Sequence, residues 1–351
     1  MKKVFVGLSG GVDSAVSAYL LKEAGYDVTG VFLKVWEPDF LPCTSPQDRL
    51  EAMRVAAHLE IPFLTYNLEE EYKRGVVDYF INEYREGRTP NPDVMCNREI
   101  KFGAFWERAK KDGADAIATG HYAVCKEIDG RHALMRSPDE GKDQSYFLWT
   151  LTQDDLAHVL FPVGHLEKHE VRRIAEEAAL PNYDRKDSQG LCFLGHVDMQ
   201  EFLKHYIPVE RGVVRTTEGK EIGTHDGISF YTIGQRFPLP GTIKQYVVAK
   251  DTAKNELIVS ESLTQGHTQA RSIVHIQKVH WIREAPDPEK VYDIQIRYHG
   301  ECFKAKIQVH AVHFETPVLV APGQSLVVYD PEHDECLGGG IIAGNADHFE
   351  R

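Results

Sequence analysis

A strand, a glycine-containing turn and a helix open the chain, and this start limits the fold more than any other feature. Residues 3–8 form a short apolar run, Ser9-Gly10-Gly11-Val12-Asp13-Ser14 breaks it, and apolar residues then recur at helical spacing. Glycines let the backbone approach a phosphate closely, and amides at the start of a helix point toward an anion. The Walker and dinucleotide-binding glycine patterns are absent from this segment. We therefore predict a phosphate-binding loop of another class, with an ordinary tight strand-to-helix turn as the alternative.

Strand-like and helix-like segments alternate after this start. Strands are expected at 27–35, 61–68 and 114–120, and helices at 47–60 and 100–111. Such alternation predicts an α/β fold, in which a parallel sheet carries helices on both faces.

The character of the chain changes twice further on. Helical periodicity largely disappears from about residue 207, and strand-like stretches follow a second change near 265–272. We predict an α/β domain at 1–205, a small β-rich central domain at 206–268 and a β-barrel at 269–351. Gly338-Gly339-Gly340 is expected in a turn of the barrel.

Two of the six cysteines stand in segments that suggest chemistry. Cys96 precedes the expected helix, where amide dipoles lower a thiol pKa, and Asp93 is near enough in sequence to act as an acid or base. Cys192 is preceded by Gly190 and followed by Gly195, which suggests a loop. The alternatives are that Cys96 fills space, that Asp93 caps a helix and that Cys192 is a buried structural thiol. No Cys-x-x-Cys pair and no metal-ligand histidine spacing occurs, so no metal site is expected.

Net charge argues at first sight against a nucleic-acid partner. The chain has 40 Lys and Arg against 53 Asp and Glu, a formal charge of −13. From Thr264 to His313, however, basic residues outnumber acidic ones, and a polyanion responds to the field within roughly 8–10 Å rather than to the total. A restricted basic face is therefore expected. No apolar run approaches the ~20 residues of a membrane span, and the N-terminus lacks a signal-peptide core, so we expect a cytoplasmic protein without membrane contact.

Taken together, the motifs identify a family. The opening loop resembles that of the pyrophosphate-loop ATP pyrophosphatases, and the chain as a whole resembles the tRNA-specific 2-thiouridylases. The matching segments are Ser9–Ser14, Gly87–Asp93, Cys96–Phe102, Ala118–Tyr122, Lys142–Leu148, Lys186–Leu194 and Tyr231–Arg236. The resemblance implies an adenine-nucleotide α-hydrolase-like sheet and ATP-dependent 2-thiolation of the uridine at the tRNA wobble position, position 34. ATP would adenylate O2, and sulfur from an enzyme persulfide would follow, releasing AMP and pyrophosphate.

The resemblance also assigns roles to residues. Cys192 matches the persulfide-carrying cysteine, Cys96 the second catalytic cysteine and Asp93 the acid/base group, and the cycle would end in a Cys96–Cys192 disulfide. ATP, with Mg²⁺, would contact Gly7, Leu8, Ser9, Gly10, Gly11, Val12, Asp13, Ser14, Leu33 and Gly120. The target base or other parts of tRNA would contact Asn91, Pro92, Asp93, His121, Lys142, Asp143, Gln144, Arg297, Tyr298 and Gln324. The expected partners are tRNA and a cysteine desulfurase or sulfur-relay carrier.

Two other functions remain open on the residues. A pyrophosphate-loop ligase that adenylates a small-molecule carboxylate or amide would have no need of two cysteines. A non-catalytic tRNA-binding protein that retains ATP affinity would not release AMP and pyrophosphate in response to tRNA. His121 has its own alternative as a core histidine after Gly120.

Overall fold

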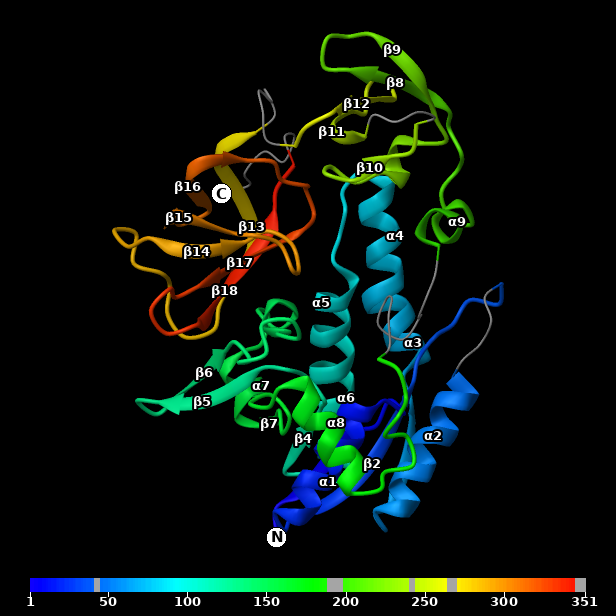
Figure 1. Cartoon of the computed structure of the whole chain (residues 1–351), viewed down its shortest axis with the longest axis vertical. Coiled ribbons are helices and arrows are strands. Elements are labelled where there is room, and N and C mark those ends of the chain that lie inside the picture. The colour runs from blue at the N-terminus through cyan, green and yellow to red at the C-terminus, as the bar shows by residue number, and fades with distance from the viewer. Residues whose placement is uncertain (41–44, 188–197, 240–243, 264–269, 345–351) are drawn as a thin grey trace.

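The computed structural model describes residues 1–40, 45–187, 198–239, 244–263 and 270–344. Within these ranges the strands form three sheets in different parts of the molecule (Figure 1). The parallel sheet lies at the N-terminal end, a central antiparallel-rich sheet lies at the far end, and the barrel lies beside the helices between them. Cys43 and Cys192 are outside the described residues.

The parallel sheet confirms the predicted α/β fold. Its strand order is β3-β2-β1-β4-β7, with β1 at Lys3–Gly7, β2 at Asp27–Lys34, β3 at Phe63–Asn67, β4 at Ala116–Ala118 and β7 at Val159–Leu160. Side chains alternate along β1: Val4 and Val6 join one buried cluster, whereas Phe5 joins another. Both faces of the sheet are therefore covered. The surrounding helices include α1 (Val12–Glu23), α2 (Ser45–His58), α6 (Phe105–Lys111), α7 (Gln153–Ala157) and α8 (Lys168–Glu177).

Two interrupted helices connect the sheet to the rest of the molecule. The first runs through α3 (Glu69–Tyr72), a π-helical segment at Lys73–Val77 and α4 (Asp78–Arg85). The second runs through α5 (Pro92–Cys96), a π-helical segment at Asn97–Ala104 and α6. The prediction that a helix begins after Cys96 was wrong, because Pro92 suits a first helical position and the side chain of Asn91 caps the helix there.

The central sheet has the order β10-β11-β12-β8-β9. Its strands are β8 (Gly212–Thr216), β9 (Glu221–His225), β10 (Arg236–Phe237), β11 (Gln245–Asp251) and β12 (Glu256–Ser260), and α9 (Met199–Lys204) precedes them. This arrangement agrees with the predicted small β-rich domain.

The C-terminal strands close into the predicted barrel. They are β13 (Arg271–Trp281), β14 (Tyr292–Gln295), β15 (Cys302–Gln308), β16 (Ala311–Val318), β17 (Ser325–Tyr329) and β18 (Glu335–Ile342), and pairing of β13 with β18 completes the circuit. Gly338, Gly339 and Gly340 lie inside β18, so their predicted place in a turn was wrong. A Cβ atom at Gly339 would lie 2.1 Å from the Leu326 carbonyl oxygen, which explains why this strand needs glycine.

A hairpin from the N-terminal half extends the barrel sheet. It consists of β5 (Val124–Ile128) and β6 (Arg131–Met135), and β6 pairs antiparallel with the start of β18 through Leu134 and Met135. The sequence analysis did not foresee this pairing. Within the described residues, no helix is both long enough and apolar enough to cross a membrane.

Candidate active site

The loop after β1 is held in shape by its own serines. Ser14 Oγ donates to the Gly11 carbonyl oxygen (3.1 Å) and lies 3.3 Å from Ser9 Oγ. Gly10 has a φ of +80°, and a Cβ atom there would lie 2.8 Å from the Asp48 carbonyl oxygen. Only glycine fits this position without strain. The loop leads directly into α1, whose first amides have no helical partner.

Residues far away in sequence brace the same loop. The Gly10 carbonyl oxygen accepts hydrogen bonds from Asn182 Nδ2 (2.7 Å) and from the Arg185 guanidinium (3.1 Å), and Arg185 also pairs with Asp48. Gly120 follows β4 and lies against the start of α1, since a Cβ atom there would be 2.7 Å from the Ser14 amide nitrogen. The structure thus brings Gly120 to the loop predicted to bind ATP. Leu33 is buried near the end of the neighbouring strand β2.

Asp13 faces a lysine that sequence reasoning missed. Lys168 Nζ lies 2.6 Å from Asp13 Oδ1 and 2.9 Å from Asp187 Oδ1. Tyr122 also donates its hydroxyl to Asp13 Oδ1 (2.8 Å). Burial, together with the charge of Asp13, raises the pKa of Tyr122, so this hydroxyl stays protonated. No local motif singles out Lys168. Its partner Asp13 lies more than a hundred residues away in sequence, and its partner Asp187 lies beyond the end of α8.

Asp187, the last residue of the described range 45–187, forms ion pairs with three basic side chains. Besides Lys168, its carboxylate accepts from Lys142 Nζ (2.6 Å) and from the Arg172 guanidinium (2.6 Å). Burial alone would raise the pKa of Asp187, but the hydrogen bonds from Lys142 and Lys168 outweigh it and lower the pKa to about 2. Lys142, predicted to contact tRNA, is therefore ion-paired here.

Helix α5 carries Asp93 and Cys96 one turn apart. Asn91 Oδ1 accepts from the amides of Asp93 (3.1 Å) and Val94 (3.3 Å), which starts the helix at Pro92. Positions i and i+3 share a side of a helix, so Asp93 and Cys96 face the same way. Cys96 ends α5 instead of beginning a helix, and its side chain is fully buried (0% exposed). The predicted lowering of its pKa by a helix start therefore has no basis at this position.

The central domain holds the segment that leads into α5. Lys250 of β11 donates to the Gly87 carbonyl oxygen (3.1 Å). Thr232 Oγ1 lies 3.1 Å from Thr89 Oγ1. Burial lowers the pKa of Lys250 to about 8.

The barrel holds the same segment from its other side. The Thr89 amide donates to the Pro322 carbonyl oxygen (2.8 Å), and Gln324 Nε2 donates to the carbonyl oxygens of Thr89 (2.9 Å) and Pro90 (3.3 Å). Gln324, predicted to contact tRNA, is thus positioned to hold the backbone next to Asn91.

Tyr298, in the barrel loop after β14, packs against Phe147 of the N-terminal half. Its ring centroid lies 4.2 Å from that of Phe147. Burial raises the pKa of Tyr298 to about 12, with further contributions from the charges of Asp143 and Asp93. The neighbouring Arg297 is exposed. The structure therefore places Tyr298 against Phe147, whereas Arg297 faces solvent.

Three other residues predicted to contact tRNA make contacts within the fold: His121 is buried, and Asp143 and Gln144 are half-buried. His121 is 6% exposed, its Nδ1 is 2.7 Å from Thr119 Oγ1, and burial with the charge of Lys101 lowers its pKa. This environment agrees with the alternative of a core histidine. Gln144 Oε1 accepts from the Tyr122 amide (3.0 Å). Asp143 accepts from Ser137 and Ser145, and burial raises its pKa.

Comparison with known proteins identifies the family. Three family models match in succession: the tRNA methyl transferase HUP domain over residues 2–196, the tRNA methyl transferase PRC-barrel domain over 200–261 and the aminomethyltransferase beta-barrel domain over 271–342. A tRNA-specific 2-thiouridylase MnmA from Geobacillus thermodenitrificans is 44% identical over 353 residues, covering 97% of this chain and 94% of the relative. Its counterpart from Nitrosomonas europaea is 46% identical, covering 98% and 99%. The chain belongs to the tRNA-specific 2-thiouridylase family.

Among solved structures, the U34-tRNA thiolase NcsA from Methanococcus maripaludis matches 54% of this 2-thiouridylase and 60% of its own chain, with 19% identity and a TM-score of 0.37. That likeness is too weak to bear on the site.

The other described cysteines of this 2-thiouridylase lie apart from α5. Burial raises the pKa of Cys125 to about 11 and that of Cys336 to about 12, so both thiols stay protonated and unreactive at neutral pH. Cys302 is exposed. Cys192, the predicted persulfide carrier, lies outside the described residues. Within the described ranges, no cluster of three or more His, Cys, Asp or Glu side chains is placed to hold a metal ion.

Proposed function

We propose that this member of the family catalyses ATP-dependent 2-thiolation of uridine at the wobble position of tRNA, releasing AMP and pyrophosphate. The observation that carries the proposal is the near full-length similarity to 2-thiouridylases, at 44–46% identity. It agrees with a chain that combines a phosphate loop, an Asp and a Cys on one helix, and two further domains around that helix.

The loop from Ser9 to Ser14 would hold the phosphates of ATP. Its shape depends on Gly10 and Gly120, where an added Cβ atom would meet neighbouring backbone at 2.7–2.8 Å. The first amides of α1 would donate hydrogen bonds to a phosphate. Asp13 would help hold Mg²⁺, which neutralises phosphate charge when bound. Lys168 already balances Asp13 and would then be close to the departing pyrophosphate.

Sulfur would travel through two cysteines. In one route the Cys96 thiolate attacks Sγ of the Cys192 persulfide, a Cys96–Cys192 disulfide forms and hydrosulfide leaves. Hydrosulfide then attacks C2 of the adenylated uridine and AMP departs. In the other route the terminal persulfide sulfur attacks C2 first and AMP departs. Cys96 then attacks Sγ of Cys192, which forms the disulfide and leaves the sulfur on the uridine. Both routes consume a dithiol reductant to restore the two thiols. Asp93 would act as the acid or base that donates or accepts a proton at the target uracil.

The reaction needs the buried helix to open toward its substrate. Cys96 is fully covered in this conformation, and a target base must leave its stack to reach a buried site. Asn91, Pro92 and Asp93 would meet the flipped base. Tyr298 would stack on a base, and Arg297 would contact a backbone phosphate. A cysteine desulfurase or a relay carrier would load Cys192 with sulfur. We place this reaction in the cytoplasm.

A reconstituted reaction tests the proposal. Purified enzyme, ATP-Mg, a persulfide donor carrying isotopically labelled sulfur and unmodified tRNA should yield labelled 2-thiouridine, detected by mass spectrometry. Cys192→Ser and Cys96→Ser should each abolish product, whereas Cys125→Ser, at a half-buried thiol on β5, should retain activity. Sulfur transfer that survives Cys192→Ser in a single turnover would refute the persulfide role. Adenylation of another acceptor by the double variant would instead support the ligase alternative.

A further inference from the structure

The π-helical segment after α5 changes which residue follows Cys96 on the same side of the helix. This segment, Asn97–Ala104, begins directly after Cys96. In an α-helix the fifth residue onward lies about 140° around the axis, so Lys101 would point away from Cys96. A π-helical turn joins residues i and i+5 instead, which brings Lys101 onto the side of Cys96 one turn later. Together with Asp93, one side of the helix therefore carries a carboxylate, a thiol and an ammonium in succession.

The contact made by Lys101 shows which way this side of the helix faces. Its Nζ lies 3.3 Å from Nε2 of His121, which follows the end of β4. The strand order of the parallel sheet reverses between β1 and β4. Ligands of open α/β sheets bind outside the carboxyl ends of the strands at such a point. The side with Cys96 and Lys101 therefore faces the edge of the sheet where the loop after β1 would hold ATP.

His121 orients Lys101 without cancelling its charge. An ammonium can only donate hydrogen bonds, so His121 accepts at Nε2 and carries its own proton on Nδ1, 2.7 Å from Thr119 Oγ1. Burial, together with the charge of Lys101, lowers the pKa of His121 well below its ordinary value. The imidazole is therefore neutral at neutral pH, and Lys101 keeps its positive charge beside it.

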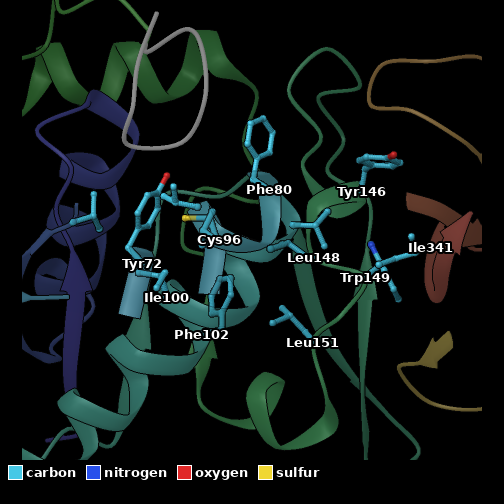
Figure 2. Close-up of a cluster of buried hydrophobic side chains, with 14 of the residues drawn as sticks. Tyr72, Phe80, Cys96, Ile100, Phe102, Tyr146, Leu148, Trp149, Leu151 and Ile341 are labelled. Atoms are coloured by element: carbon cyan, nitrogen blue, oxygen red, sulfur yellow. The ribbon is translucent and has the colours of Figure 1, made fainter. Parts of the chain in front are cut away.

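Cys96 needs a positive charge that α5 does not supply. Its side chain is fully buried in an apolar cluster that also contains Ile100 and Phe102 from the following turn (Figure 2). Apolar surroundings favour the neutral thiol, and Cys96 lies at the end of α5, away from the amides at its start. Attack on a persulfide requires the thiolate.

The other titratable groups around Cys96 do not provide that charge. Asp93, one turn earlier on the same side, is negative and opposes ionisation of the thiol. Tyr72 of α3 belongs to the same buried cluster, and a phenol is uncharged at neutral pH. His121 is neutral. Among the described residues on this side of the helix, Lys101 is the cation.

We propose that the ammonium of Lys101 stabilises the thiolate of Cys96 and so makes Lys101 a further catalytic residue of sulfur transfer. Cys96 Sγ releases its proton to solvent while Lys101 keeps its own, and the thiolate then attacks Sγ of the Cys192 persulfide as described above. An opposite charge within about 4–6 Å favours the ionised form of an acid by about 1–3 pH units. This inference rests on the proposed function, because it deepens one of its steps.

The pH dependence of alkylation tests the ion pair. Reduced enzyme is treated with iodoacetamide between pH 5 and 10, and modification of the Cys96 peptide is followed by mass spectrometry. The pH of the half-maximal rate reports ionisation, whereas the plateau at high pH reports how often the buried thiol becomes accessible. Lys101→Gln keeps a donor but loses the charge. We expect it to raise the half-maximal pH by about one unit with an unchanged plateau, so that the rate at pH 7 falls about tenfold.

Three further variants separate charge from structure. Lys101→Met, a second neutral side chain of similar length, should show the same rise, and Lys101→Arg, which keeps the charge, should return the half-maximal pH to that of wild type. Lys111→Gln removes a lysine from the exposed end of α6 and should behave as wild type. A changed plateau with the half-maximal pH of wild type in both neutral variants indicates a merely structural role and overturns the proposal. A higher Kd for ATP without a shift of the half-maximal pH assigns the ammonium to the nucleotide and also overturns it.

Single-turnover thiolation distinguishes failure of this inference from failure of the proposed function. Lys101→Gln should thiolate tRNA about tenfold more slowly than wild type at pH 7 and approach the wild-type rate at pH 9, with an unchanged Kd for tRNA. Wild-type enzyme that does not thiolate tRNA refutes the proposed function, whereas alkylation still reports the ion pair. Equal thiolation rates at pH 7, together with equal half-maximal pH values, overturn the role of Lys101 and leave the proposed function intact.

Discussion

The loop after β1 and the segment before α5 are both held by residues distant in sequence, but these residues belong to different parts of the chain. The loop is braced by Asn182 and Arg185, which belong to the same α/β part of the chain. The segment from Gly87 to Pro90 is held instead by Lys250 of the central sheet and Gln324 of the barrel. The proposed nucleotide site can therefore form when the first domain folds, whereas the segment that leads to Asp93 and Cys96 also depends on the central sheet and the barrel. We expect tRNA bound at the barrel to influence α5 without touching the loop after β1.

The largest expected effect comes from closing the ATP loop. Gly10→Ala adds a Cβ atom 2.8 Å from backbone at a positive φ, so the loop must shift. We expect ATP affinity, measured by calorimetry, to fall by about 30-fold or more while tRNA affinity stays unchanged.

The matched control is Gly25→Ala. Gly25 also has a positive φ, but an added Cβ atom there meets nothing within 4 Å. It should cost stability without altering ATP affinity. Loss of tRNA binding in Gly10→Ala would contradict the independence of the two regions.

A smaller effect should follow from loosening the segment before α5. Gln324→Ala removes the hydrogen bonds to the Thr89 and Pro90 carbonyl oxygens. We expect kcat for thiolation to fall by about tenfold, with the Kd for ATP unchanged, because Asn91 and Asp93 lose their fixed place. Single-turnover kinetics and calorimetry give the two values.

This variant also separates two roles for Gln324. If it contacts tRNA, as the family resemblance implies, the Kd for tRNA should rise in Gln324→Ala. If it acts by holding the backbone, kcat should fall by a larger factor than tRNA affinity. Gln308→Ala, an exposed glutamine on β15, is the control that should change neither.

The smallest expected effect concerns the ion network beside Asp13. The folded pKa of Asp187 is about 2, below the ordinary 3.8, so its pairing stabilises the fold above pH 4 and is lost as pH falls toward 2. Asp187→Asn should therefore lower the free energy of unfolding by about 1 kcal/mol at pH 7, a modest value because the site is partly exposed. Urea titrations between pH 3 and 7 should show this difference shrinking below pH 4.

Asp184→Asn provides the comparison for that measurement. Asp184 is exposed and makes no ion pair within the described residues. Asp184→Asn should therefore show the same dependence of the free energy of unfolding on pH as wild type. A difference for Asp187→Asn that persists unchanged at pH 3 would contradict the ion-pair explanation.

Local sequence signals predicted the parallel sheet and the turn between β1 and α1 because their causes are local. The run Val4-Phe5-Val6 and the glycines at 10 and 11 carry the information for β1 and its turn. The start of α5 was missed because apolar periodicity is weak around Pro92, although Asn91 followed by Pro92 is a helix-start signal that could have been recognised.

Other parts of the site depend on contacts that no local pattern records. Lys168 gains its importance from Asp13 and Asp187, and the fold brings Asp13 near from the opposite end of the domain. The glycines of β18 resemble turn glycines in sequence, and only the close approach of Leu326 in the neighbouring strand reveals their purpose. The role of Cys192 stays a prediction from family resemblance.

The hairpin β5–β6 has a consequence for how the protein is made. Its partner strand β18 begins about 200 residues after β6 ends. At translation speeds of 5–20 residues per second, the β6 edge waits roughly 10–40 s on the ribosome before its partner emerges. An unpaired strand edge invites pairing with other chains during that interval. The nascent chain thus passes through a period in which its first domain is built but one of its edges is unprotected, and slow synthesis or truncation before β18 would prolong that exposure.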